Sequence, residues 1–378
     1  MARILFLLRQ LEAGGAERQL IGLSRGLVRL GHEIMIAVWV PGGRYECDLS
    51  GTGIQYRVIA KRGTNDFPRF FLNVVRLVRQ FQPEVIHGYL DCGNFLAAAL
   101  RPLFPKARIA WGIRNSGQEI YDFRGKAVFA VSGLMARLPH LIISNSQAGA
   151  EHARACGYPP ARTHVIPNGI DTEFFRPDLK RGASLRREWG LGPEVTVIGL
   201  AARLDPVKDH ATFAAAARML CKRRPEVRFV CVGDGIEPYR SAALAYLRTV
   251  DLNDRVRWEG YVSDMPAFFN ALDLATSTST AEGFSNAIAE AMACGVSCVA
   301  TDVGDARTII GDTGRVVPPG DAASLAAAWQ DALESRTHGP NLECRARIVE
   351  HFSVSRLVTD TERLILPPAS RRSPSVQL

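Results

Sequence analysis

Two glutamates, Glu282 and Glu290, stand with seven residues between them across a loop that is expected to enter a helix. A helix start leaves backbone N–H groups without intrahelical partners, and its positive dipole end favours a phosphate or a sugar oxygen. The second glutamate falls about two turns further along. One carboxylate can therefore hydrogen-bond sugar hydroxyls while the other reaches a ribose, which suits a nucleotide-sugar ligand. Two solvated surface charges are the alternative.

A pair of cations, Arg203 and Lys208, lies where a predicted strand is followed by a helix. An apolar run from Val197 ends in small residues, a turn with Pro206 follows, and a helical pattern begins near Asp209. Ligands of open α/β sheets bind at such carboxyl ends of strands. A guanidinium and an ammonium in one loop can neutralise a diphosphate leaving group without a metal. The alternative is an exposed loop with ordinary surface charges.

These motifs, taken together, resemble those of retaining glycosyltransferases of the GT-B fold, the nucleotide-sugar group often called family 4. The likeness begins with an N-terminal strand and the glycine loop Leu11-Glu-Ala-Gly14-Gly15-Ala-Glu17-Arg18, and continues at 144–146 and 165–171. It is most specific in the C-terminal motifs described above. The resemblance implies an α/β protein of GT-B architecture, in which two Rossmann-like, doubly wound domains face a central cleft.

The resemblance also implies roles for individual residues. Arg203 and Lys208 would act on the donor phosphates and Glu282 on the donor sugar, as catalytic residues that also bind the donor. Glu290 would bind the ribose. Further donor-binding positions, which would supply backbone donors or line the phosphates, are Gly14, Gly15, Gly283, Phe284, Ser285 and Asn286.

The nucleobase and the acceptor have weaker signals. Turns at Gly233 and Val262 close two strands and are candidates for contacts with the base, with ordinary strand-ending turns as the alternative. His87 ends the fourth predicted strand, where many relatives of the family place a histidine, and the resemblance implies a catalytic, acceptor-binding role for it; a core histidine is the alternative. Further on, where relatives often carry another histidine, this chain has Arg114 and Asn115. Arg114 suits an anionic or pyrophosphate-linked acceptor and Asn115 a hydroxyl, with a surface turn as the alternative.

Apolar runs alternate with helical patterns twice over, as in two doubly wound sheets. Strands are predicted at 3–8, 34–39, 54–59, 84–87, 107–111, 140–144, 163–166, 195–200, 227–232, 255–259, 272–276, 297–301 and 314–317. Helices are predicted at 16–30, 209–223, 237–249, 265–270, 285–294, 321–335 and 353–366. The irregular, proline-containing stretch 167–193 is interpreted as the linker.

These patterns predict an N-terminal acceptor-side domain over 1–180 and a C-terminal nucleotide-sugar-binding domain over 181–345. A terminal helix within 346–366 is expected to cross back onto the first domain, and the tail 367–378 to be disordered. The length of 378 residues exceeds a usual single core, which agrees with two domains.

The composition is that of an ordinary globular protein, with 47% hydrophobic and 22% charged residues. The net charge of +8 suits an anionic substrate or membrane surface and allows nonspecific nucleic-acid affinity. The eight cysteines lack the spacing of a zinc site, so no metal and no other cofactor is expected. Dispersed cysteines and the absence of a signal-peptide pattern favour a cytoplasmic location.

The predicted function is transfer of a sugar, with retention, from a UDP- or GDP-sugar to a saccharide or lipid-linked acceptor, in cell-surface polysaccharide or glycolipid biosynthesis. A nucleotide-sugar epimerase of the same fold and a silent nucleotide-sugar-binding module are the alternatives. Interleaved basic and apolar residues at 68–81 and 123–130 predict peripheral contact with an anionic membrane, unless these segments pack on the sheet. No nucleic-acid partner is expected, because the basic residues are scattered.

Overall fold

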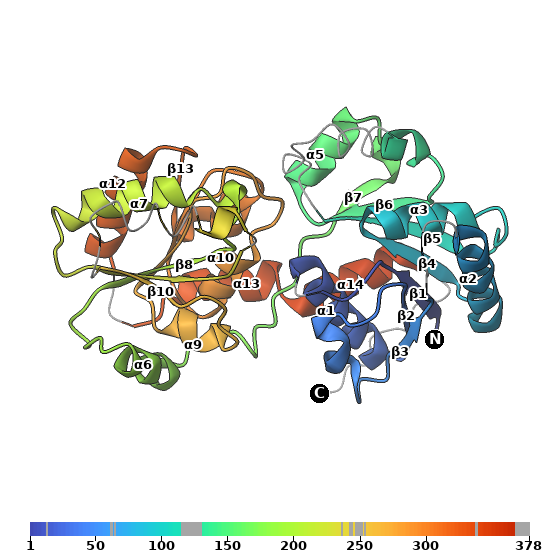
Figure 1. Cartoon of the computed structure of the whole chain (residues 1–378), viewed down its shortest axis with the longest axis horizontal. Coiled ribbons are helices and arrows are strands. Elements are labelled where there is room, and N and C mark those ends of the chain that lie inside the picture. The colour runs from blue at the N-terminus through green and yellow to red at the C-terminus, as the bar shows by residue number, and fades with distance from the viewer. Residues whose placement is uncertain are drawn as a thin grey trace. The chain divides into compact units, whose positions relative to one another are not determined.

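The computed structural model describes residues 1–12, 14–60, 63, 66–114, 131–235, 237–241, 245, 252, 255–336 and 339–366. The chain divides into two compact units. Unit 1 consists of Met1–Gly169 and Val354–Leu378, and unit 2 consists of Ile170–Ser353. Each unit is built on one parallel sheet with helices (Figure 1), so the expectation of two doubly wound α/β domains is confirmed.

The sheet of unit 1 has seven parallel strands in the order β3-β2-β1-β4-β5-β6-β7. Its strands are β1 (Arg3–Leu7), β2 (Glu33–Val38), β3 (Gln55–Val58), β4 (Val85–Tyr89), β5 (Arg108–Ile113), β6 (Leu141–Ser144) and β7 (Thr163–Val165). Its helices are α1 (Gly15–Arg29), α2 (Phe67–Phe81), α3 (Leu90–Leu100), α5 (Gln147–Ala155) and α14 (Val354–Ile365), with short 3₁₀ turns η1 (Arg44–Leu49) and η3 (Pro160–Arg162).

Unit 1 buries both faces of its sheet. Alternate residues of β1 enter two different cores: Ile4 and Phe6 pack with residues of α1 and α14, whereas Leu5 and Leu7 pack with residues of α2 and α3. This two-sided burial explains why β1 reads as an uninterrupted apolar run, since successive side chains of a strand point to opposite faces. Helix α14, near the end of the chain, lies beside α1 (Figure 1).

The sheet of unit 2 has six parallel strands in the order β10-β9-β8-β11-β12-β13. Its strands are β8 (Val197–Ala201), β9 (Arg228–Val232), β10 (Val256–Trp258), β11 (Leu274–Ser277), β12 (Cys298–Thr301) and β13 (Arg315–Val317). Its helices are α6 (Leu179–Glu188), α7 (His210–Cys221), α9 (Met265–Asn270), α10 (Asn286–Ala293), α11 (Ala306–Ile310), α12 (Ala322–Glu334) and α13 (Leu342–His351), with 3₁₀ turns η4 (Pro206–Lys208) and η5 (Gly311–Thr313). The strand order reverses between β8 and β11, which is a topological switch point.

Every strand predicted from the sequence is present, with ends that differ by one or two residues. The predicted linker 167–193 is partly wrong, because α6 lies within it. The helix begins at Asp178, whose Oδ1 accepts a hydrogen bond from the Arg181 backbone N–H at 3.0 Å. Arg181 also pairs with Asp264 ahead of α9, with Nη2 and Oδ1 2.7 Å apart. The Arg181–Asp264 pair joins residues far apart in the sequence, so the local residue pattern of 167–193 could not predict it.

The boundaries of the two units differ from the predicted domain boundaries. The Ile170 N–H donates to the Phe352 carbonyl at 2.7 Å, and Arg345 Nη1 donates to the Phe175 carbonyl at 3.0 Å. Residues 170–180 therefore belong to unit 2, and the chain returns to unit 1 at Val354. The predicted tail 367–378 and most of the predicted helix 237–249 lie outside the described residues. None of the described helices has both the length and the apolar character to cross a membrane.

Two helical glycines give opposite expectations for substitution by alanine. A Cβ at Gly182 would overlap the Asn270 backbone carbonyl, which has no flexible side chain to move aside, whereas a Cβ at Gly22 would meet only a Val354 methyl at 3.8 Å. We expect Gly182→Ala to lower the free energy of unfolding by about 1–3 kcal/mol through overpacking. Gly22→Ala should raise it by up to about 1 kcal/mol, because alanine favours a helix interior.

Urea denaturation followed by circular dichroism measures both changes. Equal shifts in the two variants, or a stabilised Gly182→Ala, would show that α6 does not pack closely on the segment after α9.

Candidate functional site

The loop after β8 brings Lys208 to the carboxyl edge of the sheet in unit 2. The Asp205 carboxylate accepts a hydrogen bond from the Val207 backbone N–H at 3.1 Å, which starts the 3₁₀ turn that ends at Lys208. The next residue, Asp209, adopts a left-handed backbone with φ 44° and caps α7 through the Thr212 N–H. The turn with Pro206, which was predicted from the sequence, thus positions the Lys208 backbone after the end of β8.

Lys208 forms a short ion pair with Glu282, with Nζ and Oε1 2.5 Å apart. The lysine and glutamate side chains are only 18% and 14% exposed, so the pair is largely shielded from solvent. The same carboxylate oxygen accepts a hydrogen bond from the Ser279 hydroxyl at 2.8 Å. The structure therefore brings together two predicted site residues that are separated by more than seventy positions in the sequence.

Backbone contacts join the loop after β11 to the loop after β8. The Thr278 hydroxyl donates to the Lys208 carbonyl at 2.7 Å, and the Thr280 N–H donates to the Val207 carbonyl at 2.7 Å. The Thr301 hydroxyl at the end of β12 donates to the Ser279 carbonyl at 2.6 Å. The loops after three neighbouring strands are thus connected, and the ion pair lies at the switch point of the sheet.

The backbone at Glu282 and Gly283 is held by the loop after β12. The Asp305 N–H donates to the Gly283 carbonyl at 3.0 Å. Gly304 has φ 56°, and a Cβ there would overlap the carbonyls of Glu282 and Gly283. A side chain at position 304 is therefore excluded both by the backbone conformation and by the close approach of the two loops.

Helix α10 begins directly after this loop, as predicted. Ser285 is its N-cap residue but makes no side-chain hydrogen bond to the helix N-terminus, and Asn286 is its first residue. The Phe284 ring is buried, 5.5 Å from the Phe352 ring, so its side chain anchors the loop. Glu290 is only 3% exposed, which shows that the alternative of a solvated surface charge is wrong for this residue.

Arg203 lies in a different environment from Lys208. Its side chain is 71% exposed, and its only ion pair among the described residues is with Asp205, with Nη2 and Oδ2 3.5 Å apart. Such an exposed pair holds the guanidinium weakly. The two predicted cations therefore differ: one is fixed by a carboxylate, and the other is free to reorient.

The two candidate turns for the nucleobase have structural roles of their own. Gly233 has φ 130°, and a Cβ there would overlap the Ala202 carbonyl, so only glycine lets the loops after β8 and β9 approach closely. Its carbonyl accepts a hydrogen bond from the Trp258 indole at 3.0 Å. Val262 packs against the core formed by α9 and α10. A contact of either residue with a base stays a prediction.

In unit 1, Gly14 and Gly15 lie at the start of α1. Gly14 is the N-cap residue, and a Cβ there would overlap the Glu17 carboxylate, which folds back over the helix start. Burial is the main cause that raises the pKa of Glu17. The position predicted to line donor phosphates is thus adjacent to a carboxylate from the same chain, a feature that the sequence reading did not anticipate.

His87 lies in β4, between β1 and β5, and is fully buried. Burial, with a smaller contribution from the Arg114 charge, lowers the pKa of His87 to about 3. The imidazole is therefore neutral at physiological pH. Its burial agrees with the alternative of a core histidine. A core histidine is normally hydrogen-bonded, however, and neither ring nitrogen of His87 has a hydrogen-bond partner among the described residues.

Arg114 follows β5 and lies over Tyr89, with its Cζ 4.3 Å from the centre of the tyrosine ring. Its Nη1 is 3.5 Å from the Asn168 side-chain oxygen. The structure thus brings Arg114 close to His87, as the predicted acceptor site requires, and adds Tyr89, which sequence reasoning missed. Asn115 lies outside the described residues.

The hydroxyl-rich run after β11 was also missed. Thr278 and Ser279 position the lysine loop and the Glu282 carboxylate, as described above. The sequence Ser277-Thr-Ser-Thr280 at the end of an apolar strand is the signal that could have revealed them. Hydroxyl groups at the end of a strand can form hydrogen bonds with the backbone of neighbouring loops.

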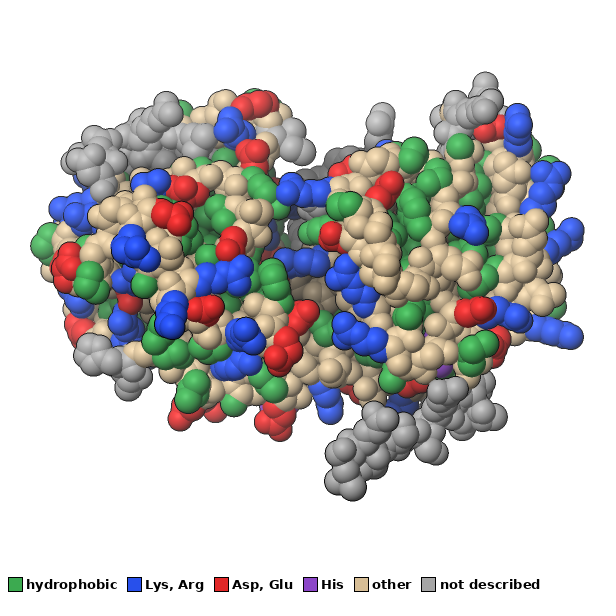
Figure 2. Space-filling view, turned by 90° about the horizontal axis from the view of Figure 1, so that it is seen from below, with side chains coloured by type: hydrophobic (Ala, Val, Ile, Leu, Met, Phe, Trp, Pro, Cys, Tyr) green, Lys and Arg blue, Asp and Glu red, His purple; other side chains and the backbone are tan. Residues whose placement is uncertain are grey.

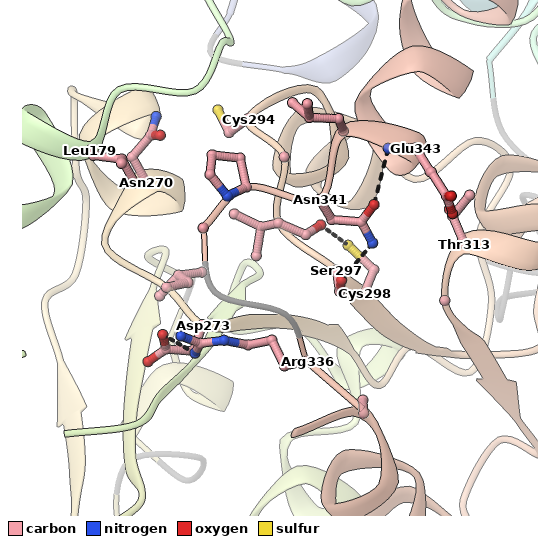
Figure 3. Close-up of a pocket in the computed structure, with 18 of the residues that line it drawn as sticks. Leu179, Asn270, Asp273, Cys294, Ser297, Cys298, Thr313, Arg336, Asn341 and Glu343 are labelled. Carbon is pink, nitrogen blue, oxygen red and sulfur yellow. Dashed lines mark hydrogen bonds and ion pairs between the residues drawn. The ribbon is translucent and has the colours of Figure 1, made fainter. Parts of the chain in front are cut away.

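A cavity of about 1040 Å³ lies elsewhere in unit 2, near the amino ends of β11 and β12 (Figure 3). Three of its charged groups pair with each other: Arg186 Nη2 lies 2.6 Å from Asp273 Oδ2, and Arg336 binds the other oxygen of the same carboxylate. The lining includes neither Lys208 nor Glu282. Since the ion pair sits at the carboxyl ends of the strands, we assign the candidate site to that edge and not to this cavity.

Comparison with known sequences identifies the family. A sequence model described as "Glycosyl transferases group 1" matches residues 195–335, and one described as "Glycosyltransferase Family 4" matches residues 13–174. The chain is 33% identical over 208 residues to D-inositol 3-phosphate glycosyltransferase 2 of Catenulispora acidiphila, covering 51% of this chain and 48% of the relative. It is 27% identical over 212 residues to the UDP-Gal:alpha-D-GlcNAc-diphosphoundecaprenol alpha-1,3-galactosyltransferase of Escherichia coli, covering 55% and 54%. The chain thus spans about half the length of these two curated relatives.

The fold has close structural counterparts. The crystal structure of Anabaena Alr3699/HepE in complex with UDP and glucose matches with a TM-score of 0.85, 23% identity, and coverage of 96% of this chain and 99% of that one. At this level of identity the match shows the fold, which is the GT-B architecture expected from the sequence. Because the two family models together match both halves of the chain and the fold agrees, the chain belongs to the group 1, family 4 glycosyltransferases.

Proposed function

We propose that this protein transfers a glycosyl unit from a nucleotide diphosphate sugar to a hydroxyl group of an acceptor. The observation that carries the proposal is the shielded Lys208–Glu282 ion pair at the switch point of unit 2, directly before the start of α10. The named relatives support it, since one uses UDP-galactose and the matching crystal structure holds UDP with glucose. By its resemblance to the family, the reaction proceeds with retention at the anomeric carbon.

The chemistry follows from charge. As the bond between the anomeric carbon and the phosphate oxygen breaks, negative charge grows on the leaving diphosphate. Lys208 and the exposed Arg203 supply positive charge to it, and the N-terminus of α10 adds its dipole. We propose that these groups act without a metal. The leaving phosphate takes the acceptor proton, so the mechanism needs no carboxylate nucleophile.

Glu282 has two roles in this proposal. In the absence of donor it neutralises Lys208, and Ser279 fixes the orientation of its carboxylate. When the diphosphate binds, phosphate oxygens compete for the ammonium, and the carboxylate becomes available to accept hydrogen bonds from sugar hydroxyls. Glu290, buried about one turn into α10, is proposed to bind the ribose. Gly283, Phe284, Ser285 and Asn286 contribute backbone groups.

Acceptors of lipid-linked or saccharide type, in polysaccharide or glycolipid assembly, agree with the printed names of the relatives, which include a diphosphoundecaprenol-linked acceptor and a lipopolysaccharide core enzyme. An epimerase of this fold would instead release a new free nucleotide sugar, and a silent binding module would release nothing. Chromatography of the nucleotide products separates these three functions, because only a transferase produces nucleoside diphosphate in proportion to glycosylated acceptor.

Removing the lysine tests the donor site. We expect Lys208→Ala to lower the transfer rate about 100- to 1000-fold, because it deletes one group that stabilises the developing charge. Glu282→Gln keeps the shape but loses the charge, and it should weaken recognition of the sugar. Release of nucleoside diphosphate is measured with a panel of UDP- and GDP-sugars, together with thermal stabilisation by each.

Lys222→Ala provides a matched control, since Lys222 is an exposed lysine at the end of α7 in the same unit. The placement of the donor site is wrong if the Lys208 and Lys222 variants, both folded, respond to the same nucleotide sugar as the wild type does.

Burial of His87 predicts a pH dependence of stability. Its pKa is about 3 in the folded protein and about 6.5 in an unfolded chain, so the unfolded state binds the proton more tightly. The contribution of His87 is fully present above pH 6.5 and is lost as the pH falls toward 3, at up to about 1.4 kcal/mol per pH unit. We expect His87→Gln to show a shallower loss of stability in this window. Denaturant titrations at several pH values measure it, and identical slopes for both proteins would contradict a buried, neutral imidazole.

Helix α2 is the proposed site of peripheral membrane contact. Its apolar face packs on the sheet through Phe70, Val74, Val75, Val78 and Phe81. This agrees with the alternative that segment 68–81 packs on the sheet. Its outer face nevertheless carries Arg69, Arg76 and Arg79 around Leu72, which is 54% exposed, and the helix contains no acidic residue. Residues spaced by three, four and seven share one side of a helix. This stripe suits anionic lipid.

The membrane proposal is tested by co-sedimentation with vesicles of phosphatidylglycerol or phosphatidylcholine. We expect binding to the anionic vesicles only, and a loss of about tenfold or more in the variant Leu72→Glu/Arg76→Glu, since each basic residue adds about 1 kcal/mol near such a surface. Leu103→Glu, at a leucine 50% exposed after α3, is the control. Equal binding by both variants would remove α2 from the proposal.

A further inference from the structure

Polar atoms without partners gather near the carboxyl edge of the sheet in unit 1. Both ring nitrogens of His87, the Tyr89 hydroxyl and the Arg114 Nε are buried and have no hydrogen-bond partner among the described residues. His87 and Tyr89 lie in β4, where Tyr89 pairs with Gly112 of β5, and Arg114 directly follows β5. A buried polar group left unpaired costs about 1–3 kcal/mol, so several in one place favour a bound partner that supplies the missing hydrogen bonds.

These side chains lie close to one another. The His87 and Tyr89 rings are 5.6 Å apart between centres, and the Arg114 guanidinium carbon lies 4.3 Å from the centre of the Tyr89 ring. Phe6 contacts both rings from β1, at 5.3 Å and 6.4 Å. The cluster therefore has an aromatic base that fixes the tyrosine and histidine, and a cation placed over it.

Arg114 carries a charge that no described residue neutralises. Among the described residues, its only side-chain hydrogen bond is the 3.5 Å contact with the Asn168 amide oxygen, which is a neutral and long interaction. Burial lowers the pKa of Arg114, which reflects the cost of shielding this charge from water. Glu17 lies close enough to Tyr89 to raise its pKa but forms no ion pair with Arg114. Charged groups with buried polar atoms, such as the Arg114 Nε, are normally paired with an anion.

We propose that Arg114 and Tyr89 bind the phosphate group of a phosphorylated acceptor. The planar guanidinium donates through Nε and a neighbouring Nη to two phosphate oxygens, and the Tyr89 hydroxyl donates to a third. A phosphate offers this third oxygen and a carboxylate does not. The neutral imidazole of His87 hydrogen-bonds a hydroxyl of the same acceptor. The inference rests on the proposed function, because it names the class of acceptor that the enzyme uses.

The phosphate can belong to a soluble sugar phosphate or to a lipid-linked phosphate, and the experiment separates the two. Isothermal titration calorimetry of the full chain is performed with α-D-glucose 1-phosphate, with farnesyl diphosphate and with neutral methyl α-D-glucoside. Each titration contains saturating UDP, so that the donor-phosphate site is occupied. The variants are Arg114→Gln, Arg114→Lys and Tyr89→Phe. Arg57→Gln, at an exposed arginine of β3, is the matched control.

We expect at least one phosphorylated probe, and not the methyl glucoside, to bind the wild type and the Arg57 variant. Arg114→Gln should weaken that binding about 10- to 100-fold, the usual effect of losing a charge-assisted hydrogen bond. Arg114→Lys should restore part of it, because the charge remains while the fork is lost. Tyr89→Phe should weaken it about tenfold without lowering the thermal midpoint, since the hydroxyl has no hydrogen-bond partner among the described residues to lose.

Three results would overturn the inference: equal binding by wild type and Arg114→Gln, binding that disappears when UDP is present, or equal binding of the neutral glucoside. A fall in thermal midpoint in Tyr89→Phe that accounts for its weaker binding would likewise make the hydroxyl structural. The proposed function is judged separately. If nucleotide-sugar binding depends on Lys208 but binding of the phosphorylated probes does not depend on Arg114, the proposed transferase function is retained and the proposal of a phosphorylated acceptor is rejected.

Discussion

A shielded ion pair between Lys208 and Glu282 is the interaction on which the organisation of unit 2 depends. Burying two opposite charges costs desolvation free energy, which their attraction offsets only when the geometry is good and further hydrogen bonds complete it. Here the Ser279 hydroxyl supplies such a bond, and the Thr278 and Thr280 contacts lock the two loops that carry the charges. The loops after β8, β11 and β12 are consequently one connected edge and not three independent turns.

The two units treat their polar groups differently. In unit 2 the charged side chains are largely satisfied within the protein, as at Asp273, which accepts from two arginines and from the Val197 N–H. In unit 1 the carboxyl edge holds an arginine, a tyrosine and a histidine with polar atoms that the described chain leaves unpaired. On the face shown in Figure 2, basic and acidic side chains are interspersed.

The fold was predictable because its strands are buried on both faces. Val197 to Ala201 and Ile4 to Leu7 read as continuous runs without charged or polar side chains, and each run ends within one residue of a strand end. The pairing of Lys208 with Glu282 could be expected only from the family pattern, since nothing local connects residues so far apart. Helix α6, the closed Gly14 position and the role of Tyr89 were missed. Two of these depend on contacts across the fold, Arg181 with Asp264 and Arg114 over the Tyr89 ring. The third depends on the rotamer of Glu17, whose carboxylate folds back over its own helix start.

Unit 1 is made from both ends of the chain. Val358 of α14 packs against Gly26 of α1, where a Cβ would overlap it, and Glu362 pairs with the buried His32 at 2.8 Å. Unit 2, by contrast, is continuous in sequence. During synthesis the whole of unit 2 emerges before α14, which shares one core of the first sheet with α1, so that core stays incomplete until α14 has been made. The order of assembly is thus the reverse of the order of the chain: the second unit can close first, and the first must wait for α14.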